Sequence, residues 1–347
     1  MLLALVSGCL FAITILRFSD YSSAILDFGD SQAYISVASA IGHWNFAGLQ
    51  IKQFWGYPYA MALVSVVTRV SDQTALLAVS CTSSLLSVAF AYRLWGGWIA
   101  GFFAVLNFDW MQRSFLGGSE PLAVALIFGA FLAMREEQHL LAAFLASLST
   151  VVRPLSIFCL IGICVVLVHK REVRKLTLAI LIAACVATLY LWPLARHFGD
   201  PLATVHSYQD PSVPLFGIPF YAIVKGTILY PAPWTNLALS FLWLLLVLSG
   251  LAAAFFNPRF RDYVRRNPTE ILFAAPYLLL VFCYNYPVFA RTNFARFAIP
   301  VLPFIFLALS RWIPKDRRVL WLLGAATSVL AAASALGIRN VIHMLRG

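Results

Sequence analysis

The chain has 347 residues, of which 61% are hydrophobic and only 11% are charged. Soluble globular proteins are about half apolar and about a quarter charged, so this composition excludes a water-soluble enzyme, a disordered chain and a disulfide-rich scaffold. The net charge of +11 is compatible with an anionic partner. No contiguous basic face with base-reading elements accompanies it, however, so the sequence does not indicate a nucleic-acid partner.

The first apolar run, residues 1–17, predicts an uncleaved first membrane helix. Val6-Ser7-Gly8-Cys9 is similar to a lipoprotein cleavage site, but the apolar run continues past Cys9 and no basic residue precedes it. A removable signal has a basic start and an apolar core that ends before the cut. The six cysteines lie in apolar stretches without a CxxC pair, which predicts buried free thiols rather than disulfides or a metal site.

Residues 18–55 are the first of two long segments, and we name them the first outer loop. Within it, residues 31–47 predict an amphipathic helix that lies on the membrane. Asp30 precedes this helix, so it either caps the helix or is a functional carboxylate, as a general base or as a ligand of a divalent cation. If the helix begins at or before Asp27, then Asp27, Asp30 and Tyr34 share one face.

The apolar segments predict an all-α polytopic membrane protein, because a spanning helix needs about 20 mostly apolar residues. The acidic first outer loop and the basic segment 170–175 face opposite sides of the membrane, so an odd number of crossings must separate them. Six apolar segments lie between residues 57 and 169, so one of them is re-entrant or merged with a neighbour. We therefore expect about eleven crossings in one transmembrane domain, residues 1–347, with a cytoplasmic amino terminus. The predicted apolar segments are 1–17, 57–70, 75–92, 96–112, 119–134, 139–152, 154–169, 176–193, 236–256, 269–290, 296–311 and 318–338.

Three short basic segments between apolar runs carry most of the excess positive charge: residues 170–175, 259–266 and 311–318. Basic residues in short loops mark the cytoplasmic side of a membrane protein, where they also contact anionic lipid headgroups. The second long segment, residues 194–235, then lies on the same side as the first outer loop. We name it the second outer loop; in it, Tyr221 to Tyr230 predicts a further amphipathic helix.

Several motifs, taken in order along residues 1–310, resemble the GT-C fold of membrane glycosyltransferases, a grouping that includes protein O-mannosyltransferases and aminoarabinose transferases. Asp30 and Tyr34 are followed by the predicted amphipathic helix and by Gly56-Tyr57-Pro58 at the next apolar segment. Val152-Arg153-Pro154-Leu155 is similar to the Thr/Val-Arg-Pro signature of bacterial members, and residues 291–303 are similar to their late Arg–aromatic–Pro–Pro segment. Many members place two adjacent acids where this chain has Asp30-Ser31, so the second acid is Asp27, Glu120 or absent.

The resemblance implies transfer of a sugar from a polyprenyl-phosphate carrier to an acceptor, on the outer face of a bacterial cytoplasmic membrane. The acceptor, whether glycan, lipid or protein, stays open. An acidic residue at the end of an apolar segment, such as Glu120, is a functional candidate by default, although Ser119 and Glu120 also suit a helix cap. Arg291 and Arg296 lie outside the basic segments and suit a phosphate, the alternative being that they reach to lipid headgroups. The implied roles are catalysis for Asp30, Asp27 and Glu120, a divalent cation (Mg²⁺ or Mn²⁺) at Asp30 if one takes part, and substrate binding for Tyr34, Tyr57, Arg153, Lys225, Arg291 and Arg296.

Three other functions compete with glycosyl transfer. A polytopic transporter or lipid flippase predicts ionisable residues in mid-helix and symmetric halves, whereas acids here gather at the ends of apolar segments. A membrane acyltransferase needs a histidine in a membrane-embedded site, and the six histidines mostly lie in loops or at helix ends. The third alternative is a non-catalytic assembly subunit, which the sequence does not exclude.

Overall fold

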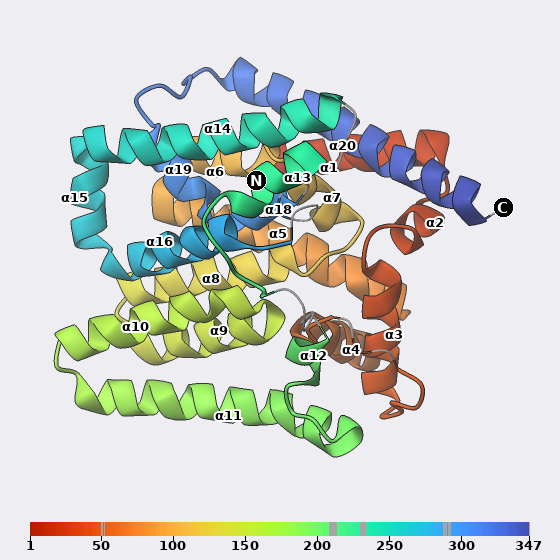
Figure 1. Ribbon diagram of the computed structural model, residues 1–347, viewed down its shortest axis with the longest axis horizontal. Helices are drawn as coiled ribbons and strands as arrows, with labels where there is room; N and C mark the ends of the chain where they lie inside the picture. Colours follow the sequence, from red (N-terminus) through yellow and green to blue (C-terminus); the bar gives the residue numbers. More distant parts are fainter. Residues whose placement is uncertain are drawn as a thin grey trace.

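The computed structural model describes residues 1–49, 51, 53–207, 214–229, 234–286, 290 and 293–346, and it is all-helical over this part of the chain. The described residues contain no strand, only an isolated antiparallel bridge between Phe216 and Tyr284. The predicted all-α fold is therefore confirmed. Figure 1 shows the helices stacked largely side by side, with α14 and α20 at one side of the bundle and α11 at the other.

The helices begin and end close to the apolar segments expected from the sequence. In chain order they are α1 (Leu2–Phe18), α2 (Tyr21–Leu26), α3 (Ser31–Gly42), α4 (Gly56–Thr68), α5 (Asp72–Trp95), α6 (Gly97–Val105), α7 (Phe108–Phe115), α8 (Glu120–Arg135), α9 (His139–Val152), η1 (Pro154–Ser156), α10 (Ile157–His169), α11 (Val173–Phe198), α12 (Ala203–His206), α13 (Tyr221–Leu229), α14 (Trp234–Phe256), α15 (Pro258–Arg266), α16 (Pro268–Cys283), α18 (Phe294–Ala298), η2 (Ile299–Val301), α19 (Leu302–Ala308) and α20 (Arg317–Arg346).

Four of the described helices are long and apolar enough to cross a membrane: 72–95, 173–198, 237–256 and 317–337. The pair α7 and α8 gives a fifth if it is counted as one span, although the two helices meet at 103°. Six further apolar helices among the described residues are shorter, at 10–17 residues. The structure thus has four to five candidate spans, and the count of about eleven crossings stays a prediction.

The stretch predicted as an apolar segment at 96–112 is broken, and the break shapes the site. Asn107 ends the apolar run: its side chain accepts a hydrogen bond from the Trp110 backbone N–H at 3.2 Å and caps α7. After α7, Gly117 has φ +103°, a conformation that favours glycine, and it turns the chain into α8. The short α7 therefore runs at a steep angle to α8, and it leads directly into the loop that precedes α8.

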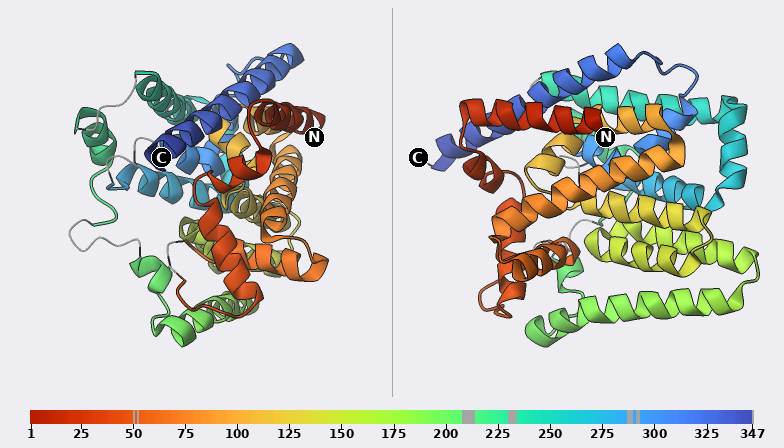
Figure 2. Two further views of the ribbon diagram at one scale, coloured as in Figure 1. Left: turned by 90° about the vertical axis from the view of Figure 1, so that its right-hand side faces the viewer. Right: turned by 180° about the vertical axis from the view of Figure 1, so that it is seen from behind.

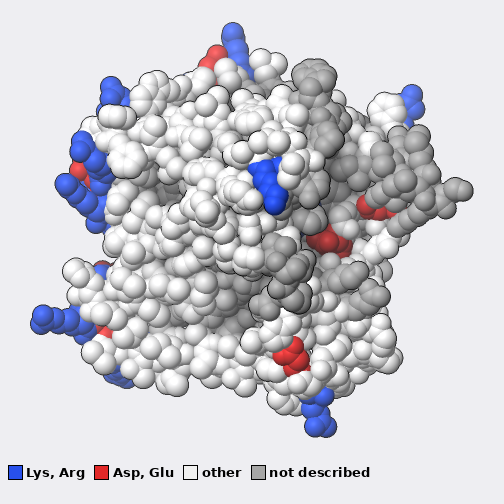
Figure 3. Space-filling model, viewed as in Figure 1, with Lys and Arg blue, Asp and Glu red and all other residues white. Residues whose placement is uncertain are grey.

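The three basic segments lie at one end of the helix stack. In Figure 1 the α10–α11 connection, α15 and the α19–α20 connection all lie at the left edge, and the rear view in Figure 2 agrees. Figure 3 shows Lys and Arg gathered along this edge beside a wide uncharged surface. We name this edge the basic end. Helices α3 and α12, from the two outer loops, lie toward the opposite end together with the carboxyl terminus.

An aromatic cluster fastens the first outer loop to the end of α11. The ring of Phe46 stacks on Trp55 with centroids 5.5 Å apart and on His197 at 4.3 Å, while Trp44 stacks on Trp192 at 6.2 Å. Phe46 and Trp55 are buried. We name Trp44, Phe46, Trp55, Trp192, His197 and Phe198 the aromatic clasp. The first outer loop thus contacts the start of the second outer loop, through His197 and Phe198.

Candidate functional site

Asp30 occupies the N-cap position of α3, but its side chain makes no cap hydrogen bond. Its Oδ1 instead accepts a hydrogen bond from Gln53 Nε2 at 3.3 Å, and its Oδ2 lies 3.8 Å from Arg296 Nη2. The carboxylate remains 39% exposed. These contacts favour the functional interpretation of Asp30 over the helix cap. The residue occupies the N-cap position, but its carboxylate contacts residues from other parts of the fold and remains accessible.

Glu120 is the opposite case, a carboxylate enclosed by arginines. It begins α8, and neither it nor Ser119 caps that helix through a side chain. Its Oε1 accepts a hydrogen bond from Arg153 Nη1 at 2.6 Å and another from Arg296 Nε. Only 2% of the Glu120 side chain is exposed. A buried carboxylate of this kind is tolerated because it is paired, so Glu120 fixes the two guanidinium groups.

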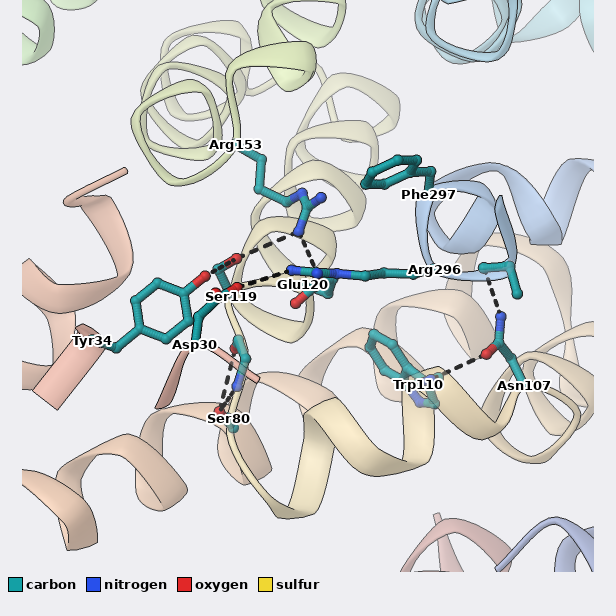
Figure 4. Close-up of polar contacts among 12 residues, drawn as sticks. Asp30, Tyr34, Ser80, Asn107, Trp110, Ser119, Glu120, Arg153, Arg296 and Phe297 are labelled. Atoms are coloured by element: carbon teal, nitrogen blue, oxygen red, sulfur yellow. Dashed lines mark hydrogen bonds and ion pairs between the residues drawn. The ribbon is translucent and has the colours of Figure 1, made fainter. Parts of the chain in front are cut away.

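Arg296 connects the two carboxylates, as Figure 4 shows. Its Nε bonds Glu120, which leaves Nη2 directed toward Asp30. Arg296 lies in the short helix α18, and Asn107 Nδ2 donates to the Ala295 carbonyl at 3.0 Å, which holds α18 against the break between α6 and α7. We name Asp30, Glu120, Arg153 and Arg296 the ionic cluster.

Two tyrosines line the cluster from the α3 and α4 side. Tyr34 donates from its hydroxyl to Ser119 Oγ at 3.2 Å, and Arg153 Nη1 lies 3.4 Å from the same oxygen. Burial raises the pKa of Tyr34, and the charges of Asp30 and Glu120 raise it further, so its phenol stays a neutral donor. The Tyr57 ring packs edge-on against the Tyr34 ring with centroids 5.0 Å apart. Tyr57 is completely buried, and its ring contact holds the Tyr34 ring in place.

The structure adds Arg113 and Asp109 of α7 to this region, neither of which the sequence analysis identified. The Arg113 guanidinium lies over the Phe28 ring, 4.6 Å from its centroid, directly beneath the turn that carries Asp30. Arg113 Nε is buried without a hydrogen-bond partner among the described residues. A signal was present in the sequence: Asp109 and Arg113 are the charged residues of 96–119 and stand four apart, the spacing of neighbours on a helix.

Asp27 and Lys225 do not belong to the ionic cluster. Asp27 does not share a helix face with Asp30 and Tyr34, because α2 ends at Leu26 and Gly29 turns the chain at φ +49° before α3 begins. The condition for a shared face, a helix that begins at or before Asp27, is therefore not met, and Asp27 is the C-cap residue of α2. Lys225 contacts the Tyr221 ring at 5.5 Å and has no ion pair to the cluster among the described residues. Arg291 lies outside the described residues.

The expected helix 31–47 is also shorter than predicted. It ends at Gly42, and Trp44 then takes a left-handed conformation with φ +52°. This turn directs the chain into the aromatic clasp. The expected helix at Tyr221 to Tyr230 corresponds to α13.

Most carboxylate oxygens around Asp30 have basic or amide partners, although Gln53 Oε1 and Glu120 Oε2 are buried without a hydrogen-bond partner among the described residues. The Asp30 carboxylate pairs with Arg296 and Gln53, and the second carboxylate, Glu120, is bonded to two guanidinium groups. Hard cations need several free oxygen ligands, and the described part of the chain contains no group of three His, Cys, Asp or Glu side chains arranged to hold a metal.

The arrangement can bind an anion and accept a proton at adjacent positions. Two guanidinium groups are oriented by one buried carboxylate, and an accessible carboxylate lies beside them. Guanidinium groups suit phosphate because their planar fork of donors matches two phosphate oxygens. No protein-family model, no curated protein and no solved structure matches this chain.

Proposed function

We propose that this chain is a membrane glycosyltransferase that moves a sugar from a polyprenyl-phosphate carrier to an acceptor. The motif resemblance along residues 1–310 introduced this function, and the ionic cluster is the observation that carries it. Asp30 and Arg296 come from opposite ends of the sequence, yet their charged atoms lie 3.8 Å apart. Glycosyl transfer from a lipid phosphate needs this pair of groups, one to take a proton and one to receive a phosphate.

The orientation of the site agrees with a donor on the outer face. The basic end, under the positive-inside rule, is cytoplasmic. Helix α3, which follows Asp30, and helix α12 lie toward the opposite end (Figure 1). Large apolar side chains remain exposed on the candidate spans, among them Leu189, Leu242 and Leu330, and this surface suits the hydrocarbon of the membrane and of a polyprenyl tail.

In the proposed reaction the acceptor hydroxyl or amine attacks the anomeric carbon of the donor sugar. Asp30 takes the proton of the attacking group, the new bond to the anomeric carbon forms, and the bond from that carbon to the phosphate oxygen breaks. Polyprenyl phosphate leaves with the electron pair, and Arg296 and Arg153 stabilise the charge that develops on it. A positioned general base contributes about 10²–10⁴-fold, and fixed charge at the leaving group is usually a large contribution.

The test is transfer of radiolabelled sugar from polyprenyl-phosphate hexose in membranes that contain the protein. Asp30→Asn is expected to reduce transfer by about 10²–10⁴-fold without loss of folded protein, because this carboxylate is partly exposed. Asp20→Asn is the matched control: Asp20 also lies in the first outer loop and caps α2 through its side chain, and asparagine caps equally well. Equal transfer by wild type and Asp30→Asn contradicts the assignment of Asp30.

A transporter or lipid flippase is the second candidate, because the cluster lies where helices are interrupted. The α7–α8 pair bends by 103° immediately before Glu120, and the segment 294–308 is divided into α18, η2 and α19. Transporters use interrupted helices of this kind for midplane binding sites. Reconstituted protein that moves a labelled lipid phosphate across the bilayer, without transferring its sugar to any acceptor, supports this function and contradicts the first.

A further inference from the structure

A hollow apart from the ionic cluster lies among α1, α5, α6 and α20, near the basic end, and the rear view in Figure 2 shows how these helices are arranged. It has a volume of about 240 Å³ and is formed by the starts of α1, α6 and α20 and the last turns of α5. Its lining is mostly apolar, with the side chains of Leu3, Ala4, Val88, Ala100, Ala104 and Leu320. None of these residues belongs to the ionic cluster, so this hollow is a separate feature.

Small residues of α6 keep the hollow open. Gly97, Ala100, Gly101 and Ala104 recur at spacings of three and four along the helix, which places them on one face. A Cβ at Gly101 would lie only 3.0 Å from Leu320 Cδ1. Larger residues on this face would therefore fill the space between α6 and α20.

The opening of the hollow is positively charged and aromatic. Arg317, the first residue of α20, and Trp321, one turn further on, both line it and are exposed, as is Tyr92 of α5. No acidic residue lines the hollow. Aromatic residues settle at the level of the lipid headgroups, so these side chains mark the depth at which a headgroup would lie.

The surroundings of the hollow decide the kind of ligand that reaches it. Leu2 and Leu5 of α1 and Leu322 of α20 are 68%, 45% and 71% exposed, so the adjoining surface faces hydrocarbon in a membrane. A ligand that enters from this surface must be an amphiphile. Because the opening carries a guanidinium and the basic end is cytoplasmic by charge, an acidic headgroup of the cytoplasmic leaflet complements it.

We propose that this hollow binds one anionic phospholipid, with an acyl chain against the apolar lining and the phosphate at Arg317. This site is independent of the proposed sugar transfer, since it lies at the other end of the bundle from Asp30. Its occupant ties α1, α5, α6 and α20 together, and the site therefore couples the membrane's anionic lipid content to the stability of the fold.

The experiment is native mass spectrometry of the full chain, released from detergent after incubation with phosphatidylglycerol or with phosphatidylcholine of the same acyl chains. Wild type is expected to retain the anionic lipid about fivefold better, the gain typical of one basic residue near the headgroups. Arg317→Gln should abolish this preference. Arg318→Gln, the neighbouring arginine that does not line the hollow, should keep it.

A second variant tests whether the lipid enters the hollow. Gly97 begins α6 with an ordinary helical conformation, and a Cβ there would lie 3.4 Å from the Tyr92 ring, so Gly97→Leu folds and occupies the opening. We expect this variant to lose the retained lipid of both headgroups while its helix content is unchanged. Equal retention of the two lipids by wild type, or equal losses in Arg317→Gln and Arg318→Gln, overturns the proposal.

Discussion

Arg296 Nη2 faces Asp30 Oδ2 at 3.8 Å while Nε of the same guanidinium bonds the buried Glu120. One side chain thus contacts an accessible carboxylate and an enclosed one through different nitrogens. This division requires the planar fork of arginine, since a lysine ammonium is a single point of charge. The relationship assigns the two acids different tasks: Glu120 orients Arg296, and Asp30 is left to react.

Arg296→Lys is therefore expected to be a severe change despite its conserved charge. The ammonium cannot reach Glu120 and the Asp30 side together, so the leaving phosphate loses an oriented donor. Transfer should fall by about 10²–10³-fold, the usual loss for one such donor, with kcat and kcat/KM reduced together because the interaction belongs to the transition state. Steady-state transfer kinetics measure this, with the exposed Arg318→Lys as control. A rise in KM at unchanged kcat would instead assign Arg296 to ground-state binding.

Glu120→Gln is expected to act first on stability. The change leaves Arg153 and Arg296 without their shared counter-charge, and breaking a buried pair in this way costs about 3–5 kcal/mol. Glu136→Gln provides the comparison, because the Arg93–Glu136 pair is 61% and 38% exposed and exposed pairs contribute about 0–1 kcal/mol. Thermal unfolding in detergent should show a large decrease in Tm for Glu120→Gln and almost none for Glu136→Gln. Similar values for both would mean that Glu120 is not the organising charge.

A substitution of Arg113 tests whether its contact with Phe28 stabilises the turn that carries Asp30. Arg113→Met keeps much of the side-chain volume but removes the guanidinium over Phe28. Loss of the cation–π contact weakens the turn by about 1–2 kcal/mol, so hydrogen exchange of residues 27–31 should increase while the backbone of α8 stays protected. Unchanged exchange in the turn would show that Arg113 does not support it.

The sequence was sufficient for the all-α fold class and for all four members of the ionic cluster. Asp30 was identified in the motif of the first outer loop, Glu120 at the end of an apolar segment, and Arg153 and Arg296 in the later motifs, and the structure brings these four together. A pair of Arg153 with Glu120 was one of two interpretations of Arg153, whereas the contacts of Arg296 with both acids were not predicted, because they depend on how α3, α8 and α18 pack. Periodicity also gave no warning of the break at Asn107, whose side chain is satisfied by Trp110 and Ala295 through the fold.

The local turn explains why Asp27 does not join the face of Asp30 and Tyr34. A shared face required a helix that begins at or before Asp27, because the spacing rule holds only within one uninterrupted helix, and α3 begins at Ser31. Gly29 takes φ +49°, which sends α2 and α3 in different directions. The glycine between the two acids was the available signal, since glycine favours a break of this kind.

Chelation of metal ions distinguishes an arginine-based site from a metal-based one. Since the carboxylates of the cluster are engaged by guanidinium groups, sugar transfer should keep most of its rate after treatment with EDTA. The measurement is the transfer assay with and without chelator, followed by addition of Mg²⁺ or Mn²⁺. A loss with EDTA that either ion restores would return Asp30 to the role of a cation ligand and would require Arg296 to move away from it.

The aromatic clasp gives a prediction about how the outer end of α11 is held. α11 is exposed along much of its length, and only 22% of its most apolar stretch is buried, so the contacts at its end add to a limited packing against α9 and α10. Phe46→Ala removes the ring between Trp55 and His197 and is expected to cost about 3–5 kcal/mol, the range for a buried phenylalanine. Phe256→Ala is the control, because that ring is 79% exposed. Hydrogen exchange of residues 194–207 should increase in Phe46→Ala and stay at the wild-type rate in Phe256→Ala. If both variants exchange like wild type, other contacts of α11 and not the aromatic clasp hold this helix. The first outer loop would then have no part in positioning the start of the second outer loop.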